Sequence, residues 1–211
     1  AIKKKLSRKD GHQAGIKNCI KLINNFNKLN FTISEFSFYV FSTENWKRPV
    51  TEVRDLFNLI EKFYSEFEST ANEKNLIVRH YGSRKKLSKK ILKIIDNVTA
   101  KTKRNTGQYI NLVFNYGSRD EIIEAFKKTK SNKINIKIFE KKLLTSESKD
   151  PDLIVRTGGE MRLSNFMLWQ AAYSELYFTK ILWPDFGISN LNKILINYDK
   201  RNRRFGEING T

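Results

Sequence analysis

The stretch FSFYVFSTENWKRPVTEVRDLFNLIEKFYSEF, residues 36–67, decides the fold. Its first six residues, Phe36 to Phe41, are aromatic and β-branched, a composition typical of a buried strand. Polar residues then run to Pro49, after which apolar residues recur at helical spacing from Val53 to Phe67. A strand, a polar loop and a long amphipathic helix in this order are typical of an α/β protein.

The same alternation extends along the whole chain. Helices are predicted over residues 12–29, 51–67, 89–102, 119–130, 165–172 and 189–204, and strands over 36–41, 76–81, 109–115, 153–156 and 176–178. Residues 131–138 form a variable polar stretch. The alternation predicts one α/β domain, residues 1–211, with a central, mostly parallel sheet flanked by helices. Ligands of such a sheet bind at the carboxyl ends of its strands.

Composition narrows the possible partners. With 40 Lys and Arg against 22 Asp and Glu, the 211 residues carry +18, which favours diphosphates, nucleic acids or anionic lipid as partners. A solvated basic surface explains the same charge equally well. The single cysteine, Cys19, excludes an internal disulfide and agrees with a reducing, cytoplasmic compartment. No apolar run approaches the ~20 residues that a membrane-spanning helix needs.

The first polar cluster, residues 42–49, directly follows the quoted strand. Ser42 and Asn45 alone favour a capped turn that leads into the next helix. Trp46 and Arg48 point to a ligand, because an indole offers an apolar wall and a guanidinium offers two donors to a diphosphate. Together they suit a substrate with an apolar tail and a charged head.

The second cluster is RTGGEMRLSNF, residues 156–166, between a predicted strand and a predicted helix. Arg156 and Arg162 can bind phosphate, and the Gly-Gly pair permits close approach of the backbone. Ser164 is expected near the N-terminus of the following helix, where anions bind well. A capped helix with surface ion pairs would explain Ser164 but not two Arg around a Gly-Gly turn, so we predict an anion site.

Two further polar residues stand out. Glu175 lies in the apolar segment SELYF, residues 174–178, and a buried carboxylate needs a cation, either an Arg or a metal ion. The residues alone favour an Arg. His12 follows Arg8 by four residues in a Gly-bounded turn, where a simple helix cap is the alternative to a binding role.

These clusters closely resemble successive motifs of the undecaprenyl diphosphate synthase family of cis-prenyltransferases. The matching stretches are FSTENWKRP at 41–49, NYGSRDEI at 115–122, PDLIVRTGGE at 151–160, RLSNFMLWQ at 162–170, YSELYF at 173–178 and LWPDF at 182–186. One alone is a weak signal, whereas the ordered series is specific. The resemblance implies the family's α/β fold with a hydrophobic tunnel, whose candidate wall residues are Val40, Leu56, Leu59 and Ile60.

By this resemblance the chain extends an allylic diphosphate, such as farnesyl diphosphate, with isopentenyl diphosphate to a long cis-polyprenyl diphosphate. Asn45 and Arg48 are implied as catalytic, with Asn45 assisting proton removal. The implied substrate-binding residues are Arg8, His12, Ser42, Thr43, Glu44, Trp46, Arg48, Arg156, Arg162, Leu163, Ser164, Arg204 and Gly206. Arg8 and His12 match positions that hold the allylic diphosphate, and the second cluster matches those that hold isopentenyl diphosphate.

The resemblance also concerns the cofactor and the assembly. It implies Mg²⁺ with Glu175 as a ligand, in place of the Arg that the residues alone favour. The sequence Arg204-Phe205-Gly206 looks like the family's C-terminal element, which reaches the partner's isopentenyl site, so a homodimer is implied. Peripheral contact with a membrane is compatible with these lipid substrates, and no nucleic acid partner is expected.

One family motif lies outside the sequence. Family members begin with a strand and an Asp-Gly-Asn-Gly-Arg-Trp-like loop whose Asp binds Mg²⁺, and Ala1 aligns just after that Trp. We therefore expect the first strand to be absent from this chain and the 211 residues alone to be inactive. Truncation is favoured over a non-catalytic subunit, and an organellar targeting segment upstream of Ala1 stays an open alternative.

Two rival functions have less support. Trans-prenyltransferases use the same substrates but need Asp-Asp-x-x-Asp metal motifs and an all-helical fold, and the sequence has neither. A nucleic-acid-binding module needs basic residues interleaved with aromatic residues on an exposed face, whereas the aromatic residues here follow the periods of a core.

Overall fold

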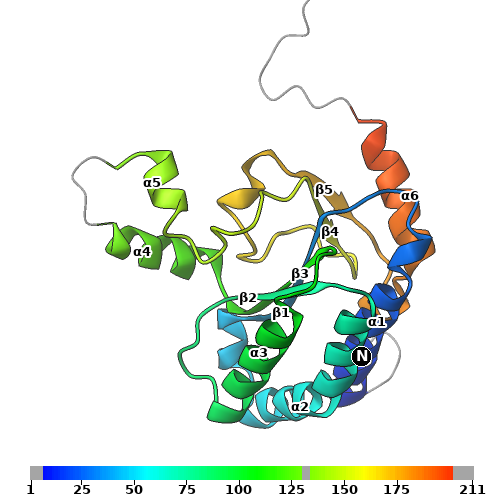
Figure 1. Cartoon of the computed structure of the whole chain (residues 1–211), viewed down its shortest axis with the longest axis horizontal. Helices are drawn as coiled ribbons and strands as arrows, with labels where there is room; N and C mark the ends of the chain where they lie inside the picture. Colours follow the sequence, from blue (N-terminus) through cyan, green and yellow to red (C-terminus); the bar gives the residue numbers. More distant parts are fainter. Residues whose placement is uncertain (1–6, 130–133, 202–211) are drawn as a thin grey trace, which may run out of the picture.

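The computed structural model describes residues 7–129 and 134–201 (Figure 1). Its helices are α1 (Arg8–Asn24), α2 (Val50–Glu73), α3 (Lys89–Thr102), α4 (Ser118–Lys128), α5 (Ile136–Glu140) and α6 (Ile188–Asp199). Its strands are β1 (Glu35–Ser42), β2 (Ile77–Tyr81), β3 (Tyr109–Tyr116), β4 (Leu153–Arg156) and β5 (Glu175–Phe178). Short 3-10 helices are η2 (Phe26–Lys28), η3 (Thr43–Lys47), η4 (Gln170–Tyr173) and η5 (Trp183–Asp185).

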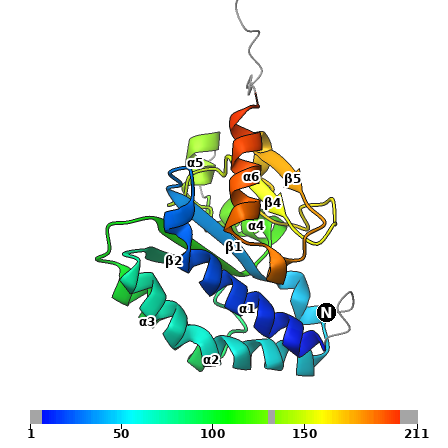
Figure 2. The ribbon, with the colours of Figure 1, turned by 90° about the vertical axis from the view of Figure 1, so that its right-hand side faces the viewer.

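These strands form two parallel sheets. In the first, β3 lies between β1 and β2, with Tyr109 opposite both Glu35 and Ile77. In the second, β4 pairs with β5, with Leu153 opposite Glu175. Within the part of the chain that the structure describes, β1 and β4 do not pair with each other. Helices α1, α2 and α3 lie on one side of the strands, and α6 lies beside β4 and β5 (Figures 1 and 2).

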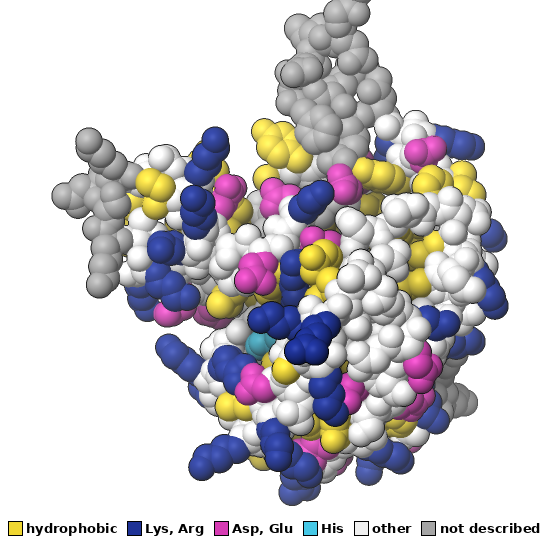
Figure 3. Space-filling view, viewed as in Figure 1, with side chains coloured by type: hydrophobic (Ala, Val, Ile, Leu, Met, Phe, Trp, Pro, Cys, Tyr) yellow, Lys and Arg dark blue, Asp and Glu magenta, His cyan; other side chains and the backbone are white. Residues whose placement is uncertain are grey.

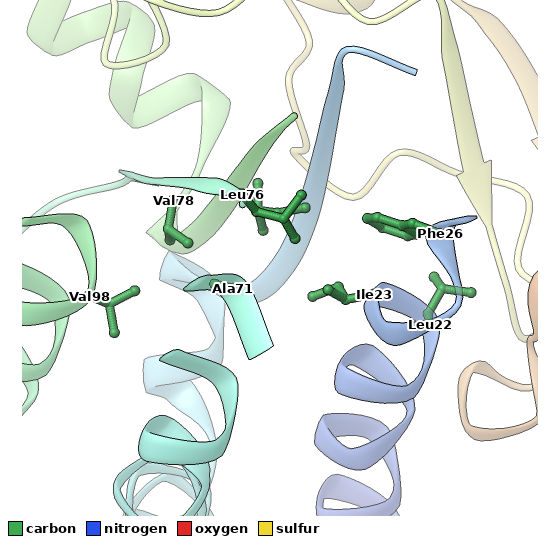
Figure 4. Packing of buried hydrophobic residues seen from close by; sticks show 8 residues of the cluster. Leu22, Ile23, Phe26, Ala71, Leu76, Val78 and Val98 are labelled. Atoms are coloured by element: carbon green, nitrogen blue, oxygen red, sulfur yellow. The ribbon is translucent and has the colours of Figure 1, made fainter. Parts of the chain in front are cut away.

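The largest buried cluster joins α1, η2, α2 and α3 to the first sheet (Figure 4). Leu22 and Ile23 of α1 and Phe26 of η2 meet Ala71 at the end of α2, together with Val98 of α3. Each large apolar side chain buried here contributes about 1.5–3 kcal/mol relative to exposure. This packing fixes α1, α2 and α3 against the strands and so sets the position of the loops that follow β1 and precede α2.

The strand predictions and the parallel α/β arrangement are confirmed, with each strand boundary within about two residues of the expected one. The helix predicted from residue 12 begins earlier, at Arg8. Ser7 is its N-cap, and the Ser7 hydroxyl accepts a hydrogen bond from the backbone N–H of Asp10 at 3.1 Å.

Two helix predictions and the prediction for residues 131–138 need correction. The helix expected at 165–172 is wrong, because Ser164, Asn165 and Met167 have φ values of 51°, 63° and 44°, which no right-handed helix contains. Only η4 follows there. The stretch 131–138 contains the first residues of α5, which is capped by Asn135. The helix expected at 189–204 corresponds to α6, which ends at Asp199.

Among residues 7–129 and 134–201, no helix is both long enough and apolar enough to cross a membrane.

Candidate functional site

A cavity of about 1690 Å³ opens at the carboxyl end of β1 and extends between α1, α2 and α3. Polar and charged residues line its mouth, whereas Val40, Leu56 and Ile60 help to form an apolar wall farther in. These three residues were predicted to face a tunnel. The fourth, Leu59, does not line the cavity and packs instead with Ile20 of α1, in the contact between α1 and α2.

At the mouth, three basic side chains from separate segments converge on Glu52 of α2. Arg8 of α1 donates a hydrogen bond from Nη1 to Glu52 Oε2. Arg48, which follows η3, donates from Nη1 to Glu52 Oε1 at 3.1 Å. His12 of α1 has its Nε2 atom 3.9 Å from the same Oε1. The expected allylic-diphosphate residues Arg8 and His12 therefore lie together with Arg48, around a carboxylate that the sequence analysis missed.

The charge state of His12 depends on this surrounding. Burial lowers the pKa of His12, the Glu52 carboxylate opposes that effect, and the positive charges of Arg48 and Arg8 add to it. The Nδ1 atom of His12 is buried and has no hydrogen-bond partner among the described residues. The net result is an imidazole that favours its neutral form while the cluster holds no anion.

In the loop after β1, the predicted residues divide into two groups. Ser42 and Asn45 line the cavity, and the backbone N–H of Ser42 donates to Asn45 Oδ1 at 3.0 Å. This hydrogen bond closes the first turn of η3 and fixes the amide of Asn45 beside the mouth.

The side chains of Thr43, Glu44 and Trp46 do not line the cavity and bind neighbouring elements instead. Thr43 Oγ1 donates to Asp120 of α4 at 2.7 Å, and Trp46 Nε1 donates to Asn115 Oδ1 at the end of β3 at 2.8 Å. Glu44 Oε1 accepts from Asn165 Nδ2 at 2.6 Å. In this structure these three residues therefore anchor the loop to its neighbours.

The second predicted cluster lines the cavity through Arg156, Arg162, Leu163 and Ser164. Arg156, the last residue of β4, donates from Nη1 to Ser164 Oγ at 2.8 Å and to the carbonyl oxygen of Arg162 at 2.6 Å. Arg162 pairs with Glu160 at 2.5 Å, and both side chains are more than half exposed. Arg156 and Arg162 therefore line the same cavity.

The prediction that Ser164 lies at a helix N-terminus is wrong. Its backbone is left-handed, and the loop is held by Asn165, whose carbonyl oxygen accepts from Ser118 N–H at 2.9 Å and whose Oδ1 accepts from Arg119 N–H at 2.9 Å. Contacts with the start of α4 thus shape the loop, and Ser164 reaches the site as a partner of Arg156.

Glu175, the expected Mg²⁺ ligand, is the first residue of β5 and does not line the cavity. Its Oε2 accepts a hydrogen bond from Arg201 Nη1, the type of partner that the residues alone favoured. Among the described residues, no three His, Cys, Asp or Glu side chains form a group that could hold a metal ion. Glu175 is therefore not part of such a group among the described residues. Arg204 and Gly206 lie outside the described residues.

Basic residues are widely spread over the surface. On the face shown in Figure 3, Lys and Arg side chains are interspersed with Asp and Glu and do not form one continuous patch. The distribution of basic side chains on this face agrees with a solvated basic surface.

Comparison with known sequences gives one family. A family model described as putative undecaprenyl diphosphate synthase matches residues 1–206. An isoprenyl transferase of Leptospira interrogans is 43% identical over 210 residues, which cover 95% of this chain and 86% of that protein. An isoprenyl transferase of Halalkalibacterium halodurans is 42% identical over 217 residues, with 99% of this chain and 84% of that protein covered.

Solved structures of similar proteins agree with this family assignment. The structure of lavandulyl diphosphate synthase from Lavandula x intermedia, in complex with dimethylallyl diphosphate, has a TM-score of 0.91 and 31% sequence identity, and covers 98% of this chain and 92% of that chain. A probable undecaprenyl diphosphate synthase from Campylobacter jejuni has a TM-score of 0.81 and 32% identity, and covers 94% and 93%.

Proposed function

The chain belongs to the undecaprenyl diphosphate synthase family, whose members are prenyltransferases, and from this we propose that it condenses isopentenyl diphosphate with an allylic diphosphate. The proposed allylic substrate is farnesyl diphosphate or a similar prenyl diphosphate. The proposed product is a long-chain cis-polyprenyl diphosphate of the kind that serves as a precursor of a lipid carrier.

The observation that carries this proposal is the chemistry of the cavity. Four basic residues, Arg8, Arg48, Arg156 and Arg162, line the same cavity as an apolar wall that includes Leu56 and Ile60. Two diphosphate groups need such cations, and a prenyl chain needs such a wall. A nucleic acid or a small polar substrate could bind at the mouth, but it has no apolar chain that would contact the apolar wall.

In the proposed reaction, C4 of isopentenyl diphosphate attacks C1 of the allylic substrate as the bond from C1 to the diphosphate oxygen breaks. Loss of a proton from C2 of the isopentenyl unit then forms the new cis double bond. Arg8, His12 and Arg48 stabilise the departing diphosphate, while Arg156, Arg162 and Ser164 hold isopentenyl diphosphate. Asn45 assists proton removal. Placement and fixed charge supply most of the rate enhancement.

The depth of the cavity favours a long product over a short one. The similar lavandulyl diphosphate synthase was solved with a five-carbon dimethylallyl group, so a short substrate is the second candidate. In this chain the residues of α2 that line the cavity extend from Glu52 to Phe67, and those of α3 extend to Thr99. Fifteen residues of helix span about 22 Å. That length exceeds what a dimethylallyl group needs.

The proposed cofactor is Mg²⁺, and Glu175 is a proposed ligand of the ion, as the family resemblance implies. Mg²⁺ is commonly held by one or two carboxylates together with substrate phosphates, so a single protein carboxylate is compatible with its binding in a substrate complex. Glu175 would have to exchange its contact with Arg201 for the ion.

The test is a condensation assay with farnesyl diphosphate and radiolabelled isopentenyl diphosphate, with product length read by thin-layer chromatography. We expect no turnover from the 211 residues alone and long products from a polypeptide that also carries the family's Asp-containing loop ahead of Ala1. Turnover by the short form would refute the first expectation. Turnover that persists in EDTA would remove Mg²⁺ from the proposal.

A homodimer and peripheral contact with a membrane complete the proposal. Leu168, Tyr173 and Leu176 are exposed on and near β5, which supports an interface there. The prenyl tails of substrate and product would favour a membrane surface. Nothing in the proposal requires a nucleic acid.

A further inference from the structure

We propose that Glu52 is a positioning residue of the allylic diphosphate subsite, an inference that rests on the proposed function. Its carboxylate fixes Arg8, His12 and Arg48 in the arrangement that receives a diphosphate, and its effect on the ligand acts through these three side chains.

Glu52 is unusually well covered for a charged residue. It lies in the first turn of α2, where the helix N-terminus favours a negative charge, and its side chain is only 11% exposed. A carboxylate so far removed from water is unfavourable unless cations or donors surround it. Burial raises the pKa of Glu52, but the hydrogen bond from Arg8 and the charges of Arg48, Arg8 and His12 outweigh burial, so the pKa lies below its usual value. Glu52 is therefore a fixed negative charge at neutral pH.

The two oxygens of this carboxylate serve different segments of the chain. Oε2 accepts from Arg8 of α1, whereas Oε1 accepts from Arg48 at 3.1 Å and lies 3.9 Å from His12 Nε2. Without Glu52, the guanidinium groups of Arg8 and Arg48 would repel each other and would lose the contact that orients them. One side chain thus joins α1, α2 and the loop that carries Asn45.

The other arginine group at the mouth has no such residue. Arg156 is held by a hydroxyl and a backbone carbonyl, and Arg162 pairs with Glu160 in an exposed contact. Neutral acceptors are therefore sufficient to orient an arginine at this mouth. Among the described contacts of the four arginines that line the cavity, a largely covered carboxylate contacts Arg8 and Arg48 but neither Arg156 nor Arg162.

Two roles for Glu52 predict opposite changes in affinity. A carboxylate beside a diphosphate repels it, so if charge alone mattered, its neutralisation would tighten binding. If Glu52 instead positions the cations, neutralisation weakens binding although it removes a repulsive charge. The sign of the change in Kd therefore separates the two roles.

The experiment compares Glu52→Gln and Glu52→Asp with Glu68→Gln in the 211-residue chain. Glu68 is a matched control because it lies on the same helix, is 14% exposed, pairs with Lys101 and does not line the cavity. Calorimetry gives the Kd of farnesyl diphosphate and of inorganic pyrophosphate. We expect both values to rise about tenfold in Glu52→Gln, rise less in Glu52→Asp, and stay unchanged in Glu68→Gln. A Kd that stays constant or falls in Glu52→Gln overturns the proposal.

The titration of His12 is a second readout that a purely structural role would not move. The chain has two histidines, His12 and His80, so their imidazole signals can be followed by NMR. The charged groups acting on His12 are Glu52 from α2, Arg48 from the loop and Arg8 from its own helix. Because only Glu52 among these raises the pKa of His12, Glu52→Gln should lower its midpoint and leave that of His80 in place. An unchanged His12 midpoint contradicts the proposed contact.

None of these measurements requires prenyl transfer. If the wild-type chain binds pyrophosphate but not farnesyl diphosphate, the proposed substrate is wrong, and the pyrophosphate Kd still decides the role of Glu52. If the wild type binds neither ligand, both proposals fall. If Glu52→Gln and Glu52→Asp both lose their helical circular dichroism, Glu52 supports the whole fold and the positioning role is rejected.

Discussion

At the scale of single residues, Arg162 differs from its neighbour Arg156 in how much of its binding capacity remains for a ligand. The Arg156 side chain donates to Ser164 and to a backbone carbonyl, whereas the exposed Arg162 side chain pairs with Glu160. An exposed ion pair contributes little to stability, so Arg162 is the better residue with which to test the isopentenyl subsite.

We predict that Arg162→Ala weakens the binding of isopentenyl diphosphate and leaves that of farnesyl diphosphate almost unchanged. The variant removes a charge-assisted donor worth about 1.5–3 kcal/mol, which corresponds to about ten- to a hundredfold in Kd. Calorimetry with each ligand measures the difference. Arg84→Ala is the control, because Arg84 is paired with Asp96 at 2.8 Å and lies away from the cavity lining. Equal losses of affinity for both ligands would show that the assignment of Arg162 to the isopentenyl diphosphate subsite is wrong.

Glu121 supports the same region from inside the protein. This residue of α4 is 2% exposed, and its carboxylate accepts from Tyr116 Oη at 2.5 Å, Gln170 Nε2 at 3.0 Å and the backbone N–H of Thr145 at 3.1 Å. These contacts connect β3, η4 and the segment before β4. The network is structural, because every contact is within the protein and none of its members lines the cavity.

We predict that Glu121→Ala lowers the free energy of unfolding by about 2–4 kcal/mol, because it leaves several buried donors without an acceptor. Urea denaturation followed by circular dichroism measures this. Glu124→Ala, three residues later on the same helix, removes the exposed ion pair with Lys127 and should change stability by less than about 0.5 kcal/mol. Similar effects of the two variants would show that the buried network contributes little.

Some residues could be placed from the sequence and others could not. Arg156 and Arg162 were predicted to contribute to one anion site because they flank a Gly-Gly turn after a strand, and the chain between them is short. Glu52 and Glu121 were missed because an acid in the first turn of a helix is ordinary, and its burial depends on elements far away in the sequence. Thr43, Glu44 and Trp46 bind α4, β3 and the 156–166 loop for the same long-range reason.

At the scale of elements, the strands were the most predictable part of the fold. Strands β1 and β3 are rich in aromatic and β-branched residues, which favour strands. Residues 165–172 were predicted as a helix because their apolar residues recur at helical spacing. Contacts of Asn165 with α4 and Glu44 instead hold the backbone there in a left-handed conformation. The five-residue α5 is too short for any periodicity to reveal it.

One face of helix α2 lines the cavity, and another face packs against α1. Two adjacent residues, Leu59 and Ile60, lie on these different faces. Ile60 lines the cavity, and Leu59 is buried against α1. We predict that Ile60→Trp, made in the polypeptide with the family's Asp-containing loop, shortens the product. The indole would fill the channel, while the first condensations at the distant mouth would continue. Chromatography of radiolabelled products measures the change in length.

Leu59→Ala in the same polypeptide is the matched control for that experiment. It should lower the free energy of unfolding by about 2–5 kcal/mol, as expected for a buried leucine, without shortening the product. If Leu59→Ala shortens the product as much as Ile60→Trp does, product length depends on the general stability of α2 and not on the cavity wall.

At the scale of the whole molecule, the apolar residues of the C-terminal third serve two different purposes. Phe186 is buried, and Trp183 packs against it in the core beneath α6. Tyr173 and Leu176 remain exposed. The exposed apolar side chains available for an interface in this part of the chain therefore include Tyr173 and Leu176, beside and on β5.

Strand β5 is suited to a symmetric contact between two copies of the chain. In the described residues it pairs only with β4, so its other edge is open, and Leu176 on it is 38% exposed. A two-fold axis at this edge would bring the same residues of both copies together. We predict that the protein sediments as a dimer and that Leu176→Arg, which would place two like charges at the axis, sediments as a monomer at micromolar concentration. Val50→Arg adds the same charge at another exposed apolar residue and should remain dimeric. A monomeric wild type would exclude the homodimer, and a Leu176→Arg variant that stays dimeric would place the interface away from β5.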